Sequence, residues 1–422
     1  VGAGMVGAAL ATGLGQQGFR VGLIDRLEAP AFDPNAAPDI RVSALSAGSQ
    51  RYLDSLDAWN QITSMRSTPY RRLAVWDETR HPLSKLMPRQ LTRVEFDAAS
   101  LGGSHLGHIV ENSVTQRALW QSAQAQDNVT ALTGLSVVAL EQSDTTATLI
   151  LDDGQRLEAQ LVVGADGAQS KIRELAGIGI NRNQYAQQAM VMSVRYQGPV
   201  DDITWQGFCP SGPRAFLPLH SAEAEHPGES WASLVWYDSP DELARLKALP
   251  EEQLLQDIQA AFPPELPLLT HLEARASFPI ARQHAKRYVS GRVVLAGDSA
   301  HTINPLAGQG VNLGFQDAQC LQVLLKEARR AGVDLADPAW LQQYEAQRRP
   351  ANRRMMMTMD LFYHLFSNRV PPLHLLRNLG LGAARALPFA RNQVARYAMG
   401  IDERLPAGLS QLIDRIPGLR QL

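Results

Sequence analysis

The residues best suited to chemistry lie together in one segment, Gly297 to Asn312. An apolar strand, Arg292 to Ala296, runs into Gly297-Asp298, and a loop rich in proline and glycine then opens a helix. A carboxylate placed there can bind the hydroxyls of a sugar-like chain, and helix N-terminal N–H groups can face an electron-rich ring. His301 in the same segment is a candidate proton acceptor, although a structural histidine is the more common case.

A second candidate site lies at the beginning of the chain. Gly2-Ala3-Gly4-Met5-Val6-Gly7 fits the pattern G-x-G-x-x-G, and Asp25 ends the strand that follows the expected helix. The glycines permit a tight turn and a close approach of backbone to a pyrophosphate, while the carboxylate can bind ribose hydroxyls. Gly13 to Gly18 matches the same pattern but falls at the end of the helix, so the first match is the better candidate.

Two further charged residues are candidates for binding the same ligand. Asp166 follows the strand Leu161 to Val163 in Gly164-Ala165-Asp166-Gly167, and Arg41 lies just before Val42-Ser43. Taken alone, Asp-Gly signals a turn, Arg41 is a surface charge and Asp298 is a helix N-cap. The combination of the segments and their order along the chain favour one shared binding site over these separate structural roles.

The composition excludes several classes of function. The 422 residues carry a net charge of −2, with 45% hydrophobic and 19% charged residues. This balance gives no electrostatic reason to expect a nucleic acid partner, and the length allows two or three domains. Cys209 and Cys320 lack metal-ligand spacing and indicate a reducing compartment. No apolar run approaches the roughly 20 residues that are needed to span a bilayer.

The hydrophobic pattern predicts the elements that must position the candidate residues. Gly2 to Asp25 has the pattern of a loop, a helix and a strand, and we expect the first strand of the fold to precede Val1. Tyr185 to Phe278 is rich in strand patterns. The other predictions are strands around Arg72 to Phe96 and Thr130 to Val163, and helices at Val114 to Ala125, Ala307 to Ala331 and Ala339 to Phe366.

Together, these segments resemble the FAD-dependent aromatic hydroxylases, the single-component flavoprotein monooxygenases. That family has a glycine loop first, an Asp-Gly segment near mid-chain and a Gly-Asp segment late, and the resemblance covers nearly the whole chain. It implies an α/β fold, with a Rossmann-like FAD-binding domain, an inserted β-sheet substrate domain and C-terminal helices. The implied ranges are 1–71, 100–178 and 277–360 for the FAD-binding domain, 72–99 and 179–276 for the substrate domain, and 361–422 for the C-terminal helical segment.

The resemblance assigns roles along the whole length of FAD. Asp25, where the family more often has Glu, would bind the adenosine ribose, and Asp298 would bind the ribityl chain. Gly308 to Asn312 would face the isoalloxazine, and Asp166 would lie near the entry of NAD(P)H. The residues assigned to cofactor binding are Gly2, Gly4, Gly7, Asp25, Arg41, Asn112, Asp166, Gly297, Asp298, Pro305, Gly308, Gly310 and Asn312. With NAD(P)H as reductant and molecular oxygen as co-substrate, a flavin C4a-hydroperoxide would hydroxylate an electron-rich ring.

Within this family, the chain is most similar to the ubiquinone-biosynthesis ring hydroxylases. His108-Ile109-Val110-Glu111-Asn112 and the run from Asn304 to Gly314 are typical of them. The implied substrate is a polyprenylated benzoquinol, and its ring needs a pocket that excludes water. Candidates for the apolar wall of that pocket are Phe216, Leu217, Trp231 and Trp236. Ordinary sheet core accounts for each of these four residues equally well.

A polyprenyl tail lies in a membrane, and one segment of the chain suits such a surface. Residues 361–401 contain five arginines and neither Asp nor Glu. This composition suits peripheral contact with an anionic bilayer, or contact with the subunits of a multi-subunit quinone-biosynthesis assembly. A helical pair packed on the FAD-binding domain explains the segment slightly better. We expect a cytoplasmic protein, at or near the inner face of the membrane.

Two other functions fit part of the same residues. A hydroxylase of a soluble aromatic acid would need a cationic clamp in its pocket, for which Arg214 is the main candidate. A flavin-holding assembly subunit would need the cofactor site without turnover. Stimulation of NAD(P)H oxidation by a quinol, by a benzoate or by neither would separate the three functions.

Overall fold

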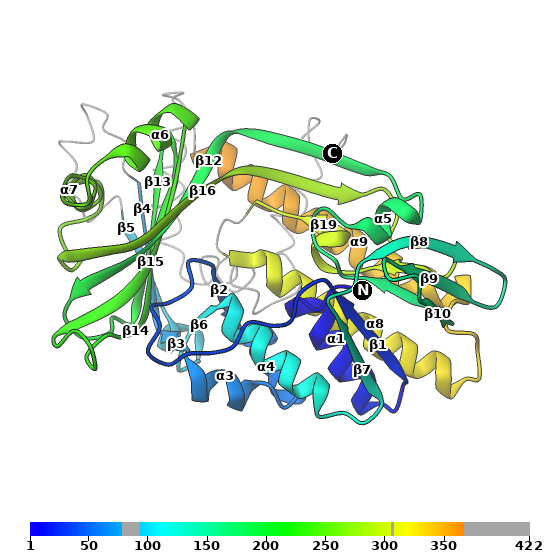
Figure 1. Cartoon of the computed structure of the whole chain (residues 1–422). Coiled ribbons are helices and arrows are strands. Elements are labelled where there is room, and N and C mark those ends of the chain that lie inside the picture. Colours follow the sequence, from blue (N-terminus) through cyan, green and yellow to red (C-terminus); the bar gives the residue numbers. More distant parts are fainter. Residues whose placement is uncertain (78–92, 305–307, 367–422) are drawn as a thin grey trace.

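The computed structural model describes residues 1–77, 93–304 and 308–366. Figure 1 shows an α/β part, which contains α1, α4 and α8, next to a large sheet that carries α6 and α7 at its far side. The long helix α9 and the long strands β12 and β16 run between the two parts. The predicted α/β fold with an additional β-rich part is therefore confirmed.

The α/β part is built around short parallel strands. These are β1 (Val21–Asp25), β7 (Val129–Thr133), β11 (Val162–Gly164) and β18 (Val293–Leu295), with β17 (Val289–Ser290) antiparallel at the edge. β1 pairs with β7, and β11 pairs with β18. Val1 and Gly2 join the two pairs, because the Val1 nitrogen donates to the Val163 oxygen at 2.7 Å and the Gly2 N–H donates to the Ile24 oxygen at 2.8 Å. Strand ends from distant stretches of sequence therefore lie side by side.

Three helices pack together on this sheet. They are α1 (Met5–Gln16), α4 (Asn112–Gln124) and α8 (Gln309–Arg330). The middle of α1, residues 7 to 15, is buried along its entire length. Small residues make this close packing feasible: a Cβ atom added at Gly13 would lie 2.4 Å from the Gln322 side chain of α8. Val6 in the first turn of α1 lies close both to Gly297, which follows β18, and to Gly314 of α8.

The β-rich part is one eight-stranded sheet. Its strands are β4 (Arg72–Asp77), β5 (Arg93–Asp97), β12 (Ile180–Gln197), β13 (Ile203–Cys209), β14 (Gly212–Ser221), β15 (Glu229–Asp238), β16 (Leu269–Ala285) and β19 (His301–Thr302). Their order is β19-β16-β12-β15-β14-β13-β4-β5. The sheet contains strands from both ranges that were predicted for the substrate domain, and β16 and β19 also bring in residues 277–285 and 301–302 from the range that was predicted for the FAD-binding domain. The division into domains stays a prediction. β19, which follows the Gly297-Asp298 turn, extends the sheet into the α/β part.

Two helices that the sequence pattern did not predict cover one face of this sheet. They are α6 (Pro240–Ala248) and α7 (Glu251–Ala261). Their buried leucine and isoleucine side chains pack in one core with Trp205, Phe216 and Trp236 of the strands. The Ser239 side chain caps α6 by accepting a hydrogen bond from the Glu242 N–H. The opposite face of the sheet carries Leu219 and Trp231, which pack on Tyr70 and Ile109.

The remaining elements connect these two parts. An antiparallel sheet of order β2-β6-β3 contains β2 (Val42–Ser46), β3 (Thr68–Tyr70) and β6 (Gly107–Glu111). A meander contains β8 (Val137–Gln142), β9 (Ala147–Leu151) and β10 (Arg156–Ala159). The short helices are α2 (Ala47–Ser55), α3 (Trp59–Met65), α5 (Lys171–Leu175) and the 3₁₀ turns η3 (Ala98–Leu101) and η4 (Gly297–Ser299).

The last described helix, α9 (Pro338–Phe366), joins the α/β part to the sheet. Met355, Met356 and Met359 pack with Phe208 of β13 and with Leu313 of α8. Of the predicted C-terminal helical segment, only residues 361–366 fall within α9, and 367–422 lie outside the described residues. The predicted membrane contact through 361–401 therefore lies mostly outside them as well.

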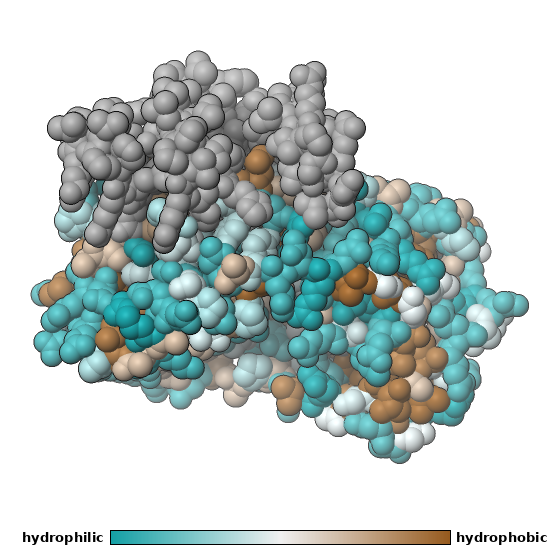
Figure 2. Space-filling model, turned by 90° about the horizontal axis from the view of Figure 1, so that it is seen from above, coloured by the Kyte–Doolittle hydropathy of each residue, from teal (hydrophilic) through white to brown (hydrophobic). Residues whose placement is uncertain are grey.

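The surface of the described residues gives no further indication of a membrane contact. None of the helices in the described ranges combines the length and the apolar character needed to cross a bilayer. Seen from above, these residues are mostly hydrophilic, with apolar residues gathered in one area at the lower right (Figure 2).

Candidate functional site

The three predicted ligand-binding segments meet around Val6 at the beginning of α1. A Cβ atom on Gly2 would lie 2.3 Å from the oxygen of Ala165, which is the neighbour of Asp166. A Cβ atom on Gly297 would lie 3.2 Å from the Val6 side chain. Arg173 joins the other two segments, because its guanidinium donates to the Ser299 oxygen at 2.9 Å. Segments that lie more than 100 residues apart in sequence therefore form one site.

The glycine loop shows which of its glycines serve packing and which leaves room for a ligand. Gly2 has φ +95°, a left-handed conformation that favours glycine. A Cβ atom on Gly7 would lie 1.8 Å from the Gly2 oxygen, so this position admits no side chain without a shift. A Cβ atom on Gly4 would meet no atom within 4 Å. The loop thus packs through Gly2 and Gly7 and presents open space at Gly4, as the close approach of a pyrophosphate requires.

Among the described residues, two helix N-termini have no side-chain cap at the N-cap position. α1 begins after Gly4 and α8 after Gly308, and neither of these N-cap residues makes a side-chain hydrogen bond. Neither helix has an acidic residue in its first turn. Gly308 has φ +62°, and Gly310 in the first turn of α8 is only partly buried. Uncapped N–H groups and the positive end of the helix dipole suit a phosphate or an electron-rich ring at both positions.

Asp25 lies at the end of β1, where the sequence places it, and its carboxylate holds the glycine loop. One carboxylate oxygen accepts from the Ala3 N–H at 2.6 Å, and the other accepts from the Leu27 N–H at 3.0 Å. Each oxygen keeps a further lone pair that can accept a hydrogen bond from a hydroxyl. The geometry therefore fits the predicted contact with a ribose, which stays a prediction.

Asp298 combines exposure to solvent with protein on most sides. Its side chain is exposed, whereas its neighbours Gly297 and Ser299 are buried. Desolvation by the surrounding protein raises the pKa of its carboxyl, and the positive charges of His301 and Arg41 partly oppose this shift. Solvent therefore reaches the Asp298 side chain although protein surrounds it on other sides. Asp298 is thus available to accept hydrogen bonds from a ribityl chain.

Arg41 and Asn112 lie at the edge of the same site. The Asn112 N–H donates to the Arg41 oxygen at 2.9 Å, and the Ser43 hydroxyl donates to the Asn112 side-chain oxygen at 2.7 Å. Arg41 is exposed, and its charge reaches Asp298. The structure therefore brings Arg41 and Asn112 together with the late Gly-Asp segment, as their predicted place beside FAD requires.

Asp166 serves as a helix cap in this structure. Its carboxylate accepts from the Ser170 hydroxyl at 2.5 Å and from the Ile172 N–H at 3.0 Å, at the beginning of α5. The structural role expected for Asp166-Gly167 was a turn, so these bonds at the beginning of α5, where Ser170 is the N-cap residue, were not predicted. Because the same turn packs on Gly2, Asp166 lies at the site, and its direct contact with FAD stays a prediction.

The side chain of Asn312 is bound by protein, and the expected place of Gly308 to Asn312 beside the isoalloxazine stays a prediction. Its oxygen accepts from the Ser46 N–H at 3.0 Å and the Ser49 hydroxyl at 2.6 Å. Its nitrogen donates to the oxygens of Ala44 at 2.9 Å and Gly308 at 3.2 Å. All four hydrogen-bonding positions of the amide are filled by protein. Asn312 therefore fixes the beginning of α8 against β2 and offers no free polar atom to a ligand.

His301 also differs from its predicted role as a direct proton acceptor. Its side chain is 1% exposed, and its Nε2 lies 2.5 Å from a carboxylate oxygen of Asp317 in α8. Its Nδ1 is buried without a hydrogen-bond partner among the described residues. A proton acceptor must reach the substrate directly or through one water, and this buried imidazole is committed to a carboxylate instead. The sequence did not foresee Asp317, which lies 16 residues later.

The predicted apolar wall divides between the two faces of the large sheet. Phe216 and Trp236 lie on the face that α6 and α7 cover, so they are sheet core and do not face the cofactor site. Leu217 and Trp231 lie on the opposite face with Tyr70 and Ile109. The apolar residues next to the beginning of α8 come from other positions. They are Phe208, Ile303, Leu313, Met355, Met356, Met359 and Tyr363.

A polar pair that the sequence did not indicate lies beside these apolar residues. The Tyr237 hydroxyl donates to the side-chain oxygen of Asn304 at 3.2 Å. The Asn304 side chain is 1% exposed, and it also forms a side-chain hydrogen bond with Tyr185. Asn304 directly precedes Pro305, which lies outside the described residues together with 306 and 307. Asn304 is thus held by two tyrosine side chains, Tyr185 and Tyr237, directly before the late loop.

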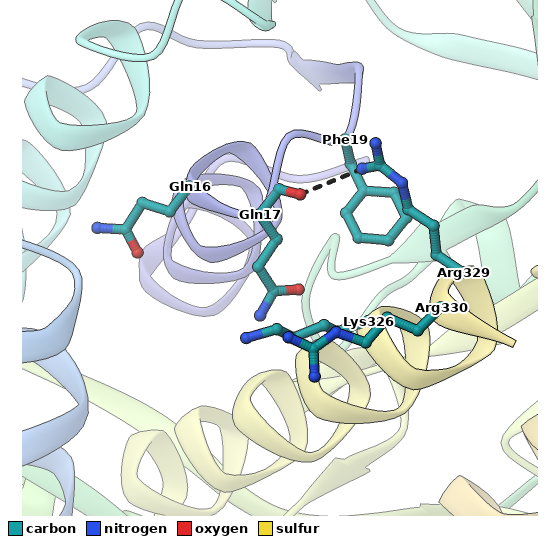
Figure 3. Close-up of a pocket in the computed structure, with 6 residues that line it drawn as sticks. All are labelled: Gln16, Gln17, Phe19, Lys326, Arg329 and Arg330. Carbon is teal, nitrogen blue, oxygen red and sulfur yellow. Dashed lines mark hydrogen bonds between the residues drawn. The ribbon is translucent and has the colours of Figure 1, made fainter.

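A separate pocket of about 400 Å³ lies at the opposite ends of α1 and α8. Figure 3 shows its lining by Gln16, Gln17, Phe19, Lys326, Arg329 and Arg330. Arg329 donates to the Gln17 oxygen at 3.1 Å, which satisfies a carbonyl at the end of α1. Cations near helix C-termini complement the negative end of the helix dipole. These contacts explain the basic side chains, and this pocket is not part of the candidate site.

An extended site with two uncapped helix N-termini, a glycine loop and carboxylates at strand ends defines a dinucleotide-binding flavoprotein. The model of the FAD binding domain family matches residues 1–359, so the chain belongs to this family. FAD is its cofactor, and the chain is an FAD-dependent monooxygenase.

Curated relatives support this assignment over the full length. The chain is 45% identical to the 3-demethoxyubiquinol 3-hydroxylase of Escherichia coli (strain K12), over 95% of this chain and 97% of the relative. It is 35% identical to the ubiquinone hydroxylase UbiL of Rhodospirillum rubrum, over 95% of this chain and 88% of the relative. Among solved structures, p-nitrophenol 4-monooxygenase PnpA from Pseudomonas putida DLL-E4 has the same fold, with a TM-score of 0.71, 19% identity and coverage of 94% of this chain and 95% of that chain.

Proposed function

We propose that this chain hydroxylates the ring of a polyprenylated benzoquinol in ubiquinone biosynthesis, with 2-polyprenyl-3-methyl-6-methoxy-1,4-benzoquinol as its substrate. The observation that carries the proposal is the 45% identity to a relative named 3-demethoxyubiquinol 3-hydroxylase, which extends over 95% of the chain. This identity covers both the FAD site and the large sheet, so it includes the residues that would contact a substrate. FAD, reduced by NAD(P)H, supplies the activation of molecular oxygen for this hydroxylation.

The residues of the chain would hold the cofactor at four points. The loop at Gly4 and the beginning of α1 would bind the pyrophosphate, and Asp25 would bind the adenosine ribose. Asp298 would accept hydrogen bonds from the ribityl chain. The N–H groups at Gly308 and Gly310 would lie along the ring and favour negative charge on it. The open space at Gly4 and the missing caps of both helices support this arrangement.

The substrate ring would lie between the beginning of α8 and the face of the large sheet that α6 and α7 do not cover. Phe208, Ile303 and Met355 would exclude water from the ring, because they form a buried apolar cluster beside α8. The Asn304 amide, which Tyr185 and Tyr237 hold in place, would lie beside the ring as a polar group. The polyprenyl tail would extend from this ring toward a membrane surface.

The proposed membrane contact involves residues 361–401, with their five arginines and no acidic residue. Such a segment would bind the anionic inner face of a membrane peripherally, or the subunits of a quinone-biosynthesis assembly. Flotation of the full-length protein with vesicles that contain anionic lipid tests this contact. Binding that is equal for neutral and anionic vesicles would contradict the electrostatic account.

Arg214 argues against the alternative of a soluble aromatic acid. Its guanidinium lies 3.8 Å from the ring centroid of Trp236, on the face of the sheet that α6 and α7 cover. Arg214 and Trp236 are directly paired across β14 and β15, so their side chains share that face. The main candidate for a carboxylate clamp therefore points away from the FAD site.

The experiment that tests the proposed function is an assay of NAD(P)H oxidation with mass analysis of the quinone products. A short-chain demethoxyquinol analogue should stimulate oxidation and gain one oxygen atom. Stimulation by benzoates instead would favour the aromatic-acid hydroxylase. Oxidation that no quinol stimulates, in a protein that keeps its FAD, would favour the flavin-holding assembly subunit and contradict the proposal.

A further inference from the structure

A buried polar network lies directly behind the turn that carries Asp298. Its centre is Asp317 of α8, whose side chain is 0% exposed. One carboxylate oxygen accepts from the Arg348 Nε at 2.7 Å and from the Asn352 side chain at 3.0 Å. The other oxygen lies 2.5 Å from the His301 Nε2 and accepts from the Gly297 N–H at 3.1 Å. Four donors therefore converge on a single carboxylate.

The charges in this network are balanced around Asp317. Burial raises the pKa of the Asp317 carboxyl, but His301, Arg348 and the donated hydrogen bonds outweigh burial and hold the pKa below its ordinary value. The carboxylate is therefore charged at neutral pH. Removing its charge would leave the guanidinium of Arg348 buried without a counterion, which is strongly unfavourable.

The bond from the Gly297 N–H gives the network a function beyond the stability of α8 and α9. Gly297 adopts φ +64° and packs on Val6 of α1, and the next residue is the exposed Asp298. The direction of the Asp298 side chain follows from the orientation of this turn. Asp317 fixes the turn from the buried side, and the open side remains free for a ligand.

We infer that Asp317 is a positioning residue for the flavin end of FAD. Through the Gly297 N–H it holds Asp298 in place for the ribityl chain, and through Arg348 and Asn352 it makes that placement depend on α9. This inference rests on the proposed role of Asp298. It also gives His301 a role: the imidazole supports the carboxylate that orients the turn.

The hydrogen bonds of Asp317 involve neither the glycine loop nor Asp25, and within the described residues the network meets that loop only where Gly297 packs on Val6. The two ends of FAD should therefore respond differently when Asp317 is changed. ADP-ribose contains the adenosine and pyrophosphate but lacks the flavin, so it reports on the glycine loop alone. We expect Asp317→Asn to weaken binding of FAD to the apoprotein at least tenfold and to leave the affinity for ADP-ribose within twofold. Titration calorimetry with both ligands measures this difference.

A control variant separates this effect from a general effect on α9. Arg354 also lies on α9 but is exposed, and Arg354→Met should leave the affinities for both ligands unchanged. His301→Gln keeps a hydrogen-bond donor and loses the imidazole, so it should weaken FAD binding severalfold. If Asp317→Asn does not bind ADP-ribose because it fails to fold, the comparison of the two ligands in His301→Gln decides the question.

Two results would overturn the inference. One is an Asp317→Asn protein that binds FAD as tightly as the unchanged protein does. The other is an equal loss of FAD and ADP-ribose affinity in Asp317→Asn or His301→Gln, which would show a merely structural role. Asp298→Ala, titrated in parallel, separates this inference from the proposed site. If Asp298→Ala weakens FAD binding and Asp317→Asn does not, only the inference about Asp317 fails; if Asp298→Ala binds FAD normally, the role of Asp298 fails as well.

Discussion

The beginnings of α1 and α8 resemble each other in charge, but different kinds of contact hold them in place. Both helices start after a glycine, without a side-chain cap and without an acidic residue in the first turn. The beginning of α1 is shaped by the absence of side chains, since Gly2 and Gly7 leave no space for a Cβ atom. The beginning of α8 is shaped by polar side chains, because Asn312 and Asp317 bind the surrounding backbone from the buried side.

This difference explains why the two ends of the site depend on different kinds of residue. In the glycine loop, nearby backbone atoms leave no space for a side chain larger than hydrogen at Gly2 and Gly7. At α8, contacts between distant residues hold the beginning of the helix in place. The buried side chains of Asn312 and Asp317 form hydrogen bonds with β2, η4, β19 and α9. Substitutions at the two ends should therefore reduce stability or FAD binding for different physical reasons.

The largest expected effect is that of Gly7→Ala. The added methyl group would lie 1.8 Å from the Gly2 oxygen, so the loop must move. Overpacking of a tight site costs about 3 kcal/mol, and we expect this loss of stability in urea unfolding together with loss of FAD. Gly22→Ala is the matched control, because a Cβ atom there meets no neighbour within 4 Å. A stable Gly7→Ala protein with normal FAD content would show that close packing does not shape this end.

The next largest effect is expected for Asn312→Ala at the other end. The substitution removes four hydrogen bonds and leaves the buried donors of Ser46 and Ser49 unpaired. Unsatisfied buried groups cost about 1 to 3 kcal/mol, so the free energy of unfolding should fall by about 2 to 3 kcal/mol. Urea unfolding of the apoprotein measures this loss in the absence of ligand. No change in stability would contradict the claim that side chains hold the beginning of α8.

Gly4→Ala separates binding from folding. A Cβ atom at Gly4 would meet no protein atom, so the stability of the apoprotein should not change. The methyl group would occupy the space that the pyrophosphate needs, and FAD affinity should fall about tenfold, or about 1.4 kcal/mol. Thermal unfolding with and without FAD shows both results in one experiment. Normal stabilisation by FAD would place the pyrophosphate elsewhere.

The smallest expected effect concerns pH and comes from His284 of β16, which lies near His301. Burial lowers the pKa of His284 to about 3, and His301 and Arg349 add to this shift through their positive charge. An unfolded histidine has a pKa of about 6.5. Between these values only the unfolded chain binds the proton, so stability is complete above pH 6.5 and decreases as the pH falls below it.

The loss should amount to about 1 kcal/mol between pH 6.5 and 5.5, because one pKa unit corresponds to about 1.4 kcal/mol. His284→Gln should remove this part of the pH dependence when urea unfolding is followed over that range. His226→Gln, in the turn between β14 and β15, is the control and should keep it. An unchanged slope in His284→Gln would exclude this imidazole as the acid-sensitive group.

The glycine loop and the individual helices and strands near the site could be predicted from the sequence, whereas contacts between distant residues could not. The glycine loop, the strand that ends at Asp25 and the long helices α8 and α9 follow from short patterns, and the structure has all of them. Asp317 and Arg348 lie 31 residues apart on two helices, and only the packing of those helices brings them together. No sequence pattern links His301 to its partner Asp317, so His301 was predicted to act as a proton acceptor.

The helices α6 and α7 show a different kind of failure. Strong strand patterns on both sides suggested a continuous β-rich region, yet the start of α6 has a clear local signal. Ser239-Pro240-Asp241-Glu242 combines an N-cap serine, proline in the first turn and early acidic residues, and the structure uses Ser239 as the cap. These helices bear on function because they cover one face of the sheet, and that face is therefore closed to a ligand.

The central claim is that three distant segments bind one FAD molecule along its whole length. Amide hydrogen exchange of the apoprotein, with and without FAD, tests it most directly. We predict that FAD slows exchange together in Gly2 to Gly7, in Ala165 to Gly167 and in Gly297 to Asn312, and leaves α6 and α7 unchanged. Protection of only one of these segments, or of none, would contradict the account.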